Sequence, residues 1–204
     1  MIKAIIFDAG EVLFNSKRSL FTVPIEYISR VTGRGLEEVD KAYREVIIEC
    51  ERKEVKESDF WKKIMVKLNV DGLYSKQDPI GEGIKVFRKN EEVFSLFESL
   101  RLKYLLAVVS NANSVEAGKI QAKEMYKHFD VVVLSFQIGV RKPDPKIYEV
   151  ALNKLNAKAS EVVFVDNAKT NIDEAKKLGF HGVLFKDVRS LKIQLSGIGV
   201  SVDI

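Results

Sequence analysis

The chain alternates short apolar runs with longer segments in which apolar residues recur every three or four positions. The short runs are rich in β-branched or aromatic side chains without polar alternation, which is typical of strands buried on both faces of a parallel sheet. They predict strands at Ala4–Phe7, Leu105–Val109, Val131–Leu134, Val162–Val165 and Gly182–Phe185. The periodic segments between the later runs predict helices at Glu91–Leu102, Val115–Tyr126, Lys146–Leu155 and Asn171–Leu178. This alternation predicts an α/β fold with a doubly wound parallel sheet.

Residues 16–87 depart from that alternation. They contain no convincing strand, and their periodicity predicts helices at Val23–Val31, Leu36–Arg52 and Asp59–Leu68. A helical insert directly after the first strand cannot be a simple crossover between neighbouring strands. We therefore expect a small helical cap domain, residues 16–87, over the carboxyl edge of the sheet, where ligands of α/β proteins bind. The core domain would then comprise residues 1–15 and 88–204.

Composition narrows the class of protein. The 204 residues are 46% hydrophobic and 30% charged, which allows a substantial core and excludes a disordered or collagen-like chain. No segment approaches the ~20 apolar residues of a membrane span, and the first strand meets charge too early for a signal peptide. Cys50 is the single cysteine, so no internal disulfide can form. We expect a cytoplasmic protein that does not bind membranes.

The charges do not indicate a polyanionic partner. The 33 basic residues are nearly balanced by 29 acidic ones, giving a formal net charge of +4. Basic and acidic residues interleave, as in residues 51–57, which is typical of solvated helix faces with ion pairs along them. A nucleic-acid groove would need clustered Lys and Arg with aromatic residues between them. We expect no nucleic-acid partner, and a homodimer is an open alternative.

Polar side chains follow the apolar runs at the points where the strands end. Asp8 ends the first strand, Ser110-Asn111 the second and Asp166-Asn167 the fourth, while Lys142 follows the third by a short loop. One such Asp alone is often a helix cap. Because the carboxyl ends of parallel strands share one edge of the sheet, however, four such ends can converge on one pocket.

These segments resemble the four motifs of the haloacid dehalogenase-like (HAD) hydrolase superfamily, and the resemblance covers nearly the whole chain. The matching segments are Phe7-Asp8-Ala9-Gly10-Glu11-Val12-Leu13, Val108-Val109-Ser110-Asn111, Arg141-Lys142-Pro143-Asp144-Pro145 and Val163-Phe164-Val165-Asp166-Asn167. The resemblance implies a Rossmann-like core, and the helical insert resembles the C1 cap of that superfamily.

The resemblance also implies roles for these residues. Asp8 would be the nucleophile that takes a phosphoryl group, with Ser110 and Lys142 as the other catalytic residues. Ser110, Asn111 and Lys142 would bind the phosphoryl oxygens of the substrate. Mg²⁺ would be the cofactor, held by Asp8, Asp166 and the backbone carbonyl of Gly10. The implied function is a Mg²⁺-dependent phosphatase of a small phosphorylated metabolite.

Three positions depart from the superfamily pattern. Gly10 stands where its phosphatases usually carry a second Asp as general acid and base, and general acid–base catalysis contributes about 10²–10⁴-fold. The chain resembles those phosphatases of the superfamily, including sugar-1-phosphate phosphatases, that also carry Gly two residues after the nucleophile. Glu11 is adjacent, but we expect its side chain to point elsewhere. Asn167 and Asn171 stand at positions that are often acidic, so we expect weaker binding of Mg²⁺.

Two other functions are compatible with the sequence. An L-2-haloacid dehalogenase also uses the Asp of the first strand and lacks the second Asp, but it works without a metal. That group has Tyr-Gly-Thr where this chain has Gly10-Glu11-Val12, and Ser-Ser-Asn where it has Asp166-Asn167-Ala168. The missing acid and the two asparagines also allow a non-catalytic protein that binds a phosphorylated ligand.

Overall fold

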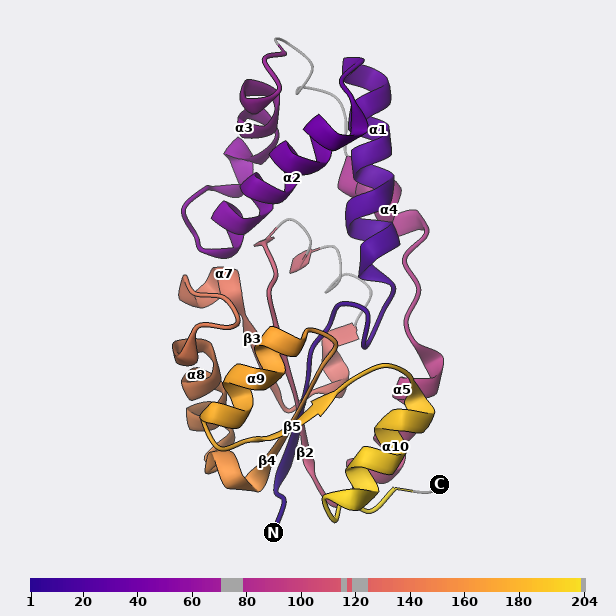
Figure 1. The fold of residues 1–204 in the computed structure, drawn as a ribbon, viewed down its shortest axis with the longest axis vertical. Helices are drawn as coiled ribbons and strands as arrows, with labels where there is room; N and C mark the ends of the chain where they lie inside the picture. Colours follow the sequence, from indigo (N-terminus) through magenta and orange to yellow (C-terminus); the bar gives the residue numbers. More distant parts are fainter. Residues whose placement is uncertain (71–78, 115–116, 119–124, 203–204) are drawn as a thin grey trace.

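The computed structural model describes residues 1–70, 79–114, 117–118 and 125–202. Five parallel strands form one sheet in the order β3-β2-β1-β4-β5, which confirms the predicted α/β fold (Figure 1). The strands are β1 (Ala4–Phe7), β2 (Leu105–Ser110), β3 (Val131–Leu134), β4 (Val162–Asp166) and β5 (His181–Leu184). β1 is central, paired with β2 on one side and with β4 on the other.

Both faces of the sheet are covered by helices, as the unbroken apolar runs predict. Ile5 and Phe7 face one apolar layer, whereas Ala4 and Ile6 face the other. The first layer contains α5 (Glu91–Leu100) and α10 (Val188–Gly197), and the second contains α8 (Pro145–Leu155) and α9 (Lys169–Lys177). Burial on both faces fixes the strands and therefore the positions of the residues that follow them.

Several boundaries differ from those predicted. α9 begins at Lys169, before the predicted Asn171, and β5 begins and ends one residue earlier than expected. α10 was not predicted, nor was the short helix α7 (Ser135–Ile138). Most of the helix predicted at Val115–Tyr126 lies outside the described residues, and Met125–His128 forms a 3₁₀ helix, η3.

A helical insert follows β1 and lies beyond the carboxyl ends of the strands (Figure 1). Its elements are η1 (Lys17–Thr22), α1 (Val23–Thr32), α2 (Leu36–Glu51), η2 (Glu57–Asp59), α3 (Phe60–Lys67) and α4 (Pro79–Lys85). Tyr43 is fully buried within it, donates a hydrogen bond to the Leu20 carbonyl at 2.9 Å and packs edge-on against Phe60. The insert thus has an apolar core, while the domain boundaries at 15/16 and 87/88 stay a prediction.

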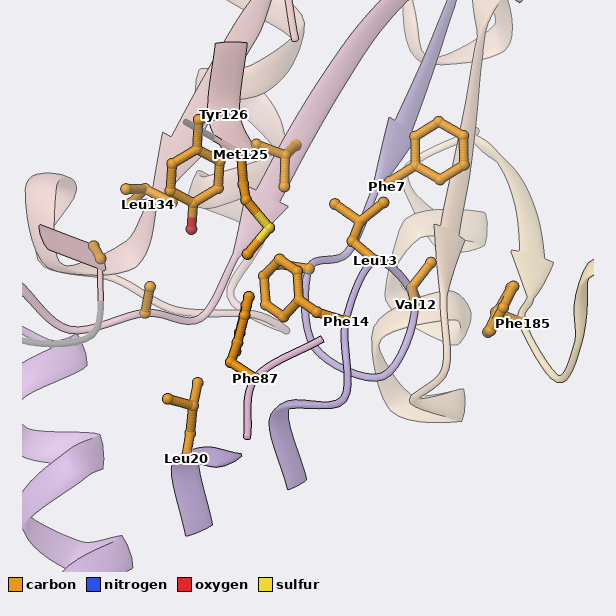
Figure 2. Close-up of a cluster of buried hydrophobic side chains, with 14 of the residues drawn as sticks. Phe7, Val12, Leu13, Phe14, Leu20, Phe87, Met125, Tyr126, Leu134 and Phe185 are labelled. Carbon is orange, nitrogen blue, oxygen red and sulfur yellow. The ribbon is translucent and has the colours of Figure 1, made fainter. Parts of the chain in front are cut away.

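The two connections between the insert and the sheet are hydrogen-bonded to each other. The Asn15 side-chain oxygen accepts from the Arg88 backbone N–H at 2.6 Å, and the Asn90 amide donates to the Val12 carbonyl at 3.1 Å. Figure 2 shows Phe14 beside Phe87, and their ring centroids lie 4.7 Å apart. These contacts fix the loop that follows Asp8. Among the described residues, no helix is long and apolar enough to cross a membrane.

Candidate active site

Lys142 joins two carboxylates at the carboxyl edge of the sheet. Its Nζ lies 2.6 Å from Asp8 Oδ1 and 2.8 Å from Asp166 Oδ2. It also donates to the Val109 carbonyl at 2.9 Å, so three hydrogen bonds hold the ammonium. The side chains of Lys142 and Asp166 are 1% and 0% exposed, whereas that of Asp8 is 12% exposed. Asp8 is therefore the more accessible of the two carboxylates.

The order of the strands explains this convergence. Asp8 directly follows β1, Asp166 is the last residue of β4, and Val109 lies near the end of β2. Because β2 and β4 flank β1 in parallel, their ends lie on either side of Asp8. The loop between α7 and α8 brings Lys142 to the same edge. Three of the residues that the sequence singled out are thus in direct contact.

The charges of this cluster are not balanced. Burial raises the pKa of Asp8 from its ordinary 3.8 to about 6; Lys142 opposes this shift, and the nearby Asp166 adds to it. Burial alone would lower the pKa of Lys142, but the two carboxylates together raise it above its usual value. Two buried carboxyl groups share one ammonium, so additional positive charge would stabilise both of them as carboxylates.

The side chain of Asn111 contacts the backbone of Lys142. Its side-chain oxygen accepts from the Lys142 N–H at 2.7 Å, and its side-chain amide donates to the Lys142 carbonyl at 3.1 Å. Ser110, the last residue of β2, is buried beside Asn111. The Asn111 side chain thus links the end of β2 to the loop that carries the lysine. Contact of Ser110 and Asn111 with a substrate stays a prediction.

Asp166 has hydrogen-bond partners on both of its oxygens. Oδ1 accepts from the Ala168 backbone N–H at 2.7 Å, and Oδ2 accepts from the Asn171 side-chain amide at 2.9 Å in addition to Lys142. Asn171 is buried, whereas Asn167 is exposed. The two asparagines are therefore not equivalent, because only Asn171 hydrogen-bonds the buried carboxylate.

The loop after Asp8 has an unusual backbone at Glu11. Glu11 has φ +59°, a left-handed conformation that non-glycine residues seldom adopt. Gly10 is not among the described glycines with positive φ. The Glu11 carboxylate accepts hydrogen bonds from the Ser16 hydroxyl and the Lys17 backbone N–H. A β-carbon on Gly10 would lie 2.7 Å from Ser16 Oγ, so Ser16 occupies the space beside this glycine.

The oxygen atoms of the site fit part of the ligand set of a hard divalent cation. Among the described residues, no group of three or more His, Cys, Asp or Glu side chains could hold a metal. Asp8 and Asp166 nevertheless supply two carboxylates, and the single ammonium of Lys142 does not balance their negative charge, which favours a cation there. Oxygen ligands of this kind suit Mg²⁺, which keeps several of its waters and needs few protein ligands. The residues are therefore compatible with a Mg²⁺ site of low ligand count.

Some groups that build the site were not predicted from the sequence. The Val109 carbonyl and the Ala168 N–H are backbone groups, whose roles carry no sequence signal. Ser135 is fully buried, and its hydroxyl bonds both the N–H and the carbonyl of Ala112, at 3.0 and 2.8 Å. Its place directly after a buried strand was the available signal for a polar role.

Comparison with known proteins places these motifs in a family. The family model described as haloacid dehalogenase-like hydrolase matches residues 2–179. The chain is 37% identical over 75 residues to the bifunctional epoxide hydrolase 2 of Rattus norvegicus, covering 37% of this chain and 14% of that protein. It is 36% identical over 92 residues to a glyceraldehyde 3-phosphate phosphatase of Pyrococcus furiosus, covering 43% of this chain and 38% of that one.

Solved structures share the fold. A HAD family enzyme from Bacteroides thetaiotaomicron superposes with a TM-score of 0.76 at 19% identity, covering 91% of this chain and 94% of that one. The same enzyme in complex with magnesium and inorganic phosphate gives a TM-score of 0.74 at 18% identity, covering 91% and 95% of the two chains. At this identity the likeness concerns the fold. The matched segments cover only part of each curated relative, for example 14% of the rat protein.

Proposed function

The chain belongs to the haloacid dehalogenase-like hydrolase family, and we propose that it is a Mg²⁺-dependent phosphatase of a small phosphorylated metabolite. The observation that carries this proposal is the Asp8–Lys142–Asp166 cluster, in which Asp8 is the carboxylate with the most exposed side chain. A site with two carboxylates and one lysine suits a phosphoryl group together with a divalent cation. The partial sequence match to the phosphatase of Pyrococcus furiosus supports the same reaction class.

Asp8 is the nucleophile in this proposal. One of its carboxylate oxygens attacks the phosphorus of the substrate, an O–P bond forms, and the bond from phosphorus to the leaving oxygen breaks. Water then attacks the phosphorus of the aspartyl-phosphate, which releases inorganic phosphate and returns the Asp8 carboxylate. Gly10 offers no carboxyl group to the leaving oxygen, so water supplies the proton or the oxyanion departs unprotonated.

Lys142 and Ser110 act on the phosphoryl oxygens. The Lys142 ammonium already contacts Asp8 and supplies positive charge where negative charge accumulates during transfer. Ser110 would donate its hydroxyl to an oxygen of the phosphoryl group. Asn111 holds the Lys142 backbone and thereby sets the position of that charge.

Asp8, Asp166 and the Gly10 backbone carbonyl would hold Mg²⁺. The ion supplies Lewis-acid neutralisation of the phosphoryl oxygens and of the nucleophilic carboxylate. Asn171 supports the site by donating a hydrogen bond to Asp166, which orients that carboxylate.

The test is a screen for released phosphate over sugar phosphates, glyceraldehyde 3-phosphate, nucleotides and acyl phosphates. We expect release from at least one class with Mg²⁺ and none in excess chelator. Chloride release from 2-chloropropionate is measured in parallel, because full activity there without metal would establish the dehalogenase reaction instead. Tight binding of phosphate without turnover of any substrate would support the non-catalytic alternative.

A further inference from the structure

Glu51 is a buried charge outside the candidate active site. The described residues include four buried Asp, Glu, Lys or Arg residues: Asp8, Lys142 and Asp166 form the site, and Glu51 is the fourth. Glu51 is the last residue of α2, in the helical insert. Its burial raises its pKa above the ordinary value, against the opposing charges of Arg141, Lys142 and Arg52. A buried carboxylate of this kind is costly unless it is paired.

The partner of Glu51 belongs to the other part of the molecule. Arg141 Nε lies 2.7 Å from Glu51 Oε2, and Arg141 directly precedes Lys142 in the loop after α7. The backbone is also close here, since a β-carbon on Gly139 would lie 3.7 Å from the Arg52 carbonyl oxygen. α2 and α7 are in contact, with α2 above α7 in the view of Figure 1. The end of α2 therefore packs on the loop that carries the lysine.

We propose that the Glu51–Arg141 ion pair docks the helical insert onto the sheet domain beside Lys142, and that both residues are positioning residues for the reaction. Arg141 and Lys142 are neighbours, yet one side chain reaches the insert and the other reaches Asp8. Any displacement of the insert is thus transmitted to the loop that holds the ammonium. The kinetic part rests on the proposed phosphatase function, whereas the docking itself does not.

The two partners differ in exposure, so we expect the loss of one to have a larger effect than the loss of the other. The Glu51 side chain is 6% exposed and the Arg141 side chain is 29% exposed. Loss of Arg141 leaves the buried Glu51 carboxylate without its ion-pair partner, whereas Arg141 without Glu51 can extend its guanidinium into water. Removing Arg141 should therefore loosen the interface more than removing Glu51, and neutralising Glu51 should rescue the loss of Arg141.

The test is a double-mutant cycle with Glu51→Gln, Arg141→Gln and the double variant. Glu45→Gln is the matched control, because Glu45 lies on the same helix and pairs with Lys67 of α3 at 2.8 Å inside the insert. The first measurement is hydrogen–deuterium exchange of peptides covering residues 48–56 and 136–144. The second is kcat and KM for the best phosphorylated substrate and for acetyl phosphate, which is too small to reach far into the insert.

We expect Arg141→Gln to speed exchange in both peptides by about tenfold or more, and Glu51→Gln to speed it less. The double variant should exchange more slowly than Arg141→Gln, and the Glu45→Gln protein should match the wild type. KM for the larger substrate should rise in the same order, with acetyl phosphate less affected. Exchange unchanged in Arg141→Gln, or effects of the two single changes that simply multiply in the double variant, would overturn the proposal. If no variant releases phosphate, the proposed function fails while exchange still decides the docking.

Discussion

The side chain of Asn111 hydrogen-bonds both backbone polar groups of Lys142. Its oxygen accepts from the Lys142 N–H at 2.7 Å, and its amide donates to the Lys142 carbonyl at 3.1 Å. One side chain at the end of β2 thus fixes the backbone of a residue that arrives from a different part of the chain. The lysine needs this support because its buried ammonium must meet two carboxylates and one carbonyl at once.

Replacement of Asn111 with alanine tests this support. The change removes two hydrogen bonds, so we expect the free energy of unfolding to fall by about 1–3 kcal/mol. We expect kcat to fall by about tenfold to 10²-fold, because a shift of the Lys142 loop misplaces the charge. KM should change less, which kinetics on the best substrate will measure. Unchanged kcat with unchanged stability would mean that Lys142 is held without Asn111.

The raised pKa of Asp8 predicts how stability depends on pH. Its ordinary value of 3.8 rises to about 6 in the folded protein, so the metal-free folded state binds this proton more tightly than the unfolded chain. The contribution of Asp8 to stability is therefore lost as pH rises from about 4 through about 6. We expect the stability of wild type minus that of Asp8→Asn to fall by about 1–3 kcal/mol between pH 4 and 7.

Urea unfolding in chelator at several pH values measures that difference. Asp173→Asn is the control, because Asp173 is about half exposed and pairs with the exposed Lys169 on the same helix. The difference in stability between wild type and Asp173→Asn should stay nearly constant between pH 4 and 7. Mg²⁺ should recover stability for the wild type at pH 7 and much less for Asp8→Asn. A flat wild-type minus Asp8→Asn curve would contradict the raised pKa.

The sequence predicted the strands and their carboxyl-end residues well, for a physical reason. Buried parallel strands are unbroken apolar runs, and the first polar residue after each run must lie at the functional edge. α10 was missed although Asp187 caps it and Leu191 and Leu195 are buried at helical spacing. α4 carries Gly81 and Gly83, which disfavour helix, and its packing against α1 and η1 decides its conformation.

The convergence of the strand ends could be predicted from the sequence, but other contacts between distant residues could not. Asn111 was noted for its place after a strand, but its hydrogen bonds to the Lys142 backbone depend on the loop conformation. The ion pair between Glu51 and Arg141 joins residues that are 90 positions apart. In the sequence, neither residue differs from the many other charged residues that are typical of a solvated surface. Such pairs follow from tertiary packing rather than from local pattern.

The asparagines beside Asp166 predict how Mg²⁺ affinity can be tuned. Asn167→Asp adds a carboxylate at an exposed position and should tighten Mg²⁺ binding without loss of stability. Asn171→Asp replaces the donor that now bonds Asp166 Oδ2 at 2.9 Å, so the metal-free protein should lose about 1–3 kcal/mol. Calorimetric titration with Mg²⁺ and unfolding in chelator compare the two variants. Equal changes in Mg²⁺ affinity and in stability for the two variants would contradict the different roles assigned to the exposed Asn167 and the buried Asn171.

Gly10 predicts a dependence of rate on the leaving group. Without an acid at this position, kcat/KM should fall steeply from aryl or acyl phosphates to alkyl phosphates. Gly10→Asp should flatten this dependence, raising turnover of alkyl phosphates by up to ~10²-fold. Its β-carbon would lie 2.7 Å from Ser16 Oγ, so the variant is best made with Ser16→Ala, which leaves the nearest atom at 3.5 Å.

The Ser16→Ala protein alone is the control for that pair. It should keep the steep dependence of the wild type, because it adds no acid. A flat leaving-group dependence in the wild type would mean that another residue already donates the proton. No gain for alkyl phosphates in the double variant would mean that a carboxyl group at position 10 does not reach the leaving oxygen.

The central claim is that Asp8 is the nucleophile of a phosphatase, and phosphate release by Asp8→Asn tests it most directly. Asparagine keeps the size of the side chain and removes the nucleophilic carboxylate. With saturating Mg²⁺ and the best substrate of the screen, the variant should be folded by circular dichroism and should release phosphate at less than about 1% of the wild-type rate. A folded Asp8→Asn protein that releases phosphate at a rate close to that of the wild type would contradict the account.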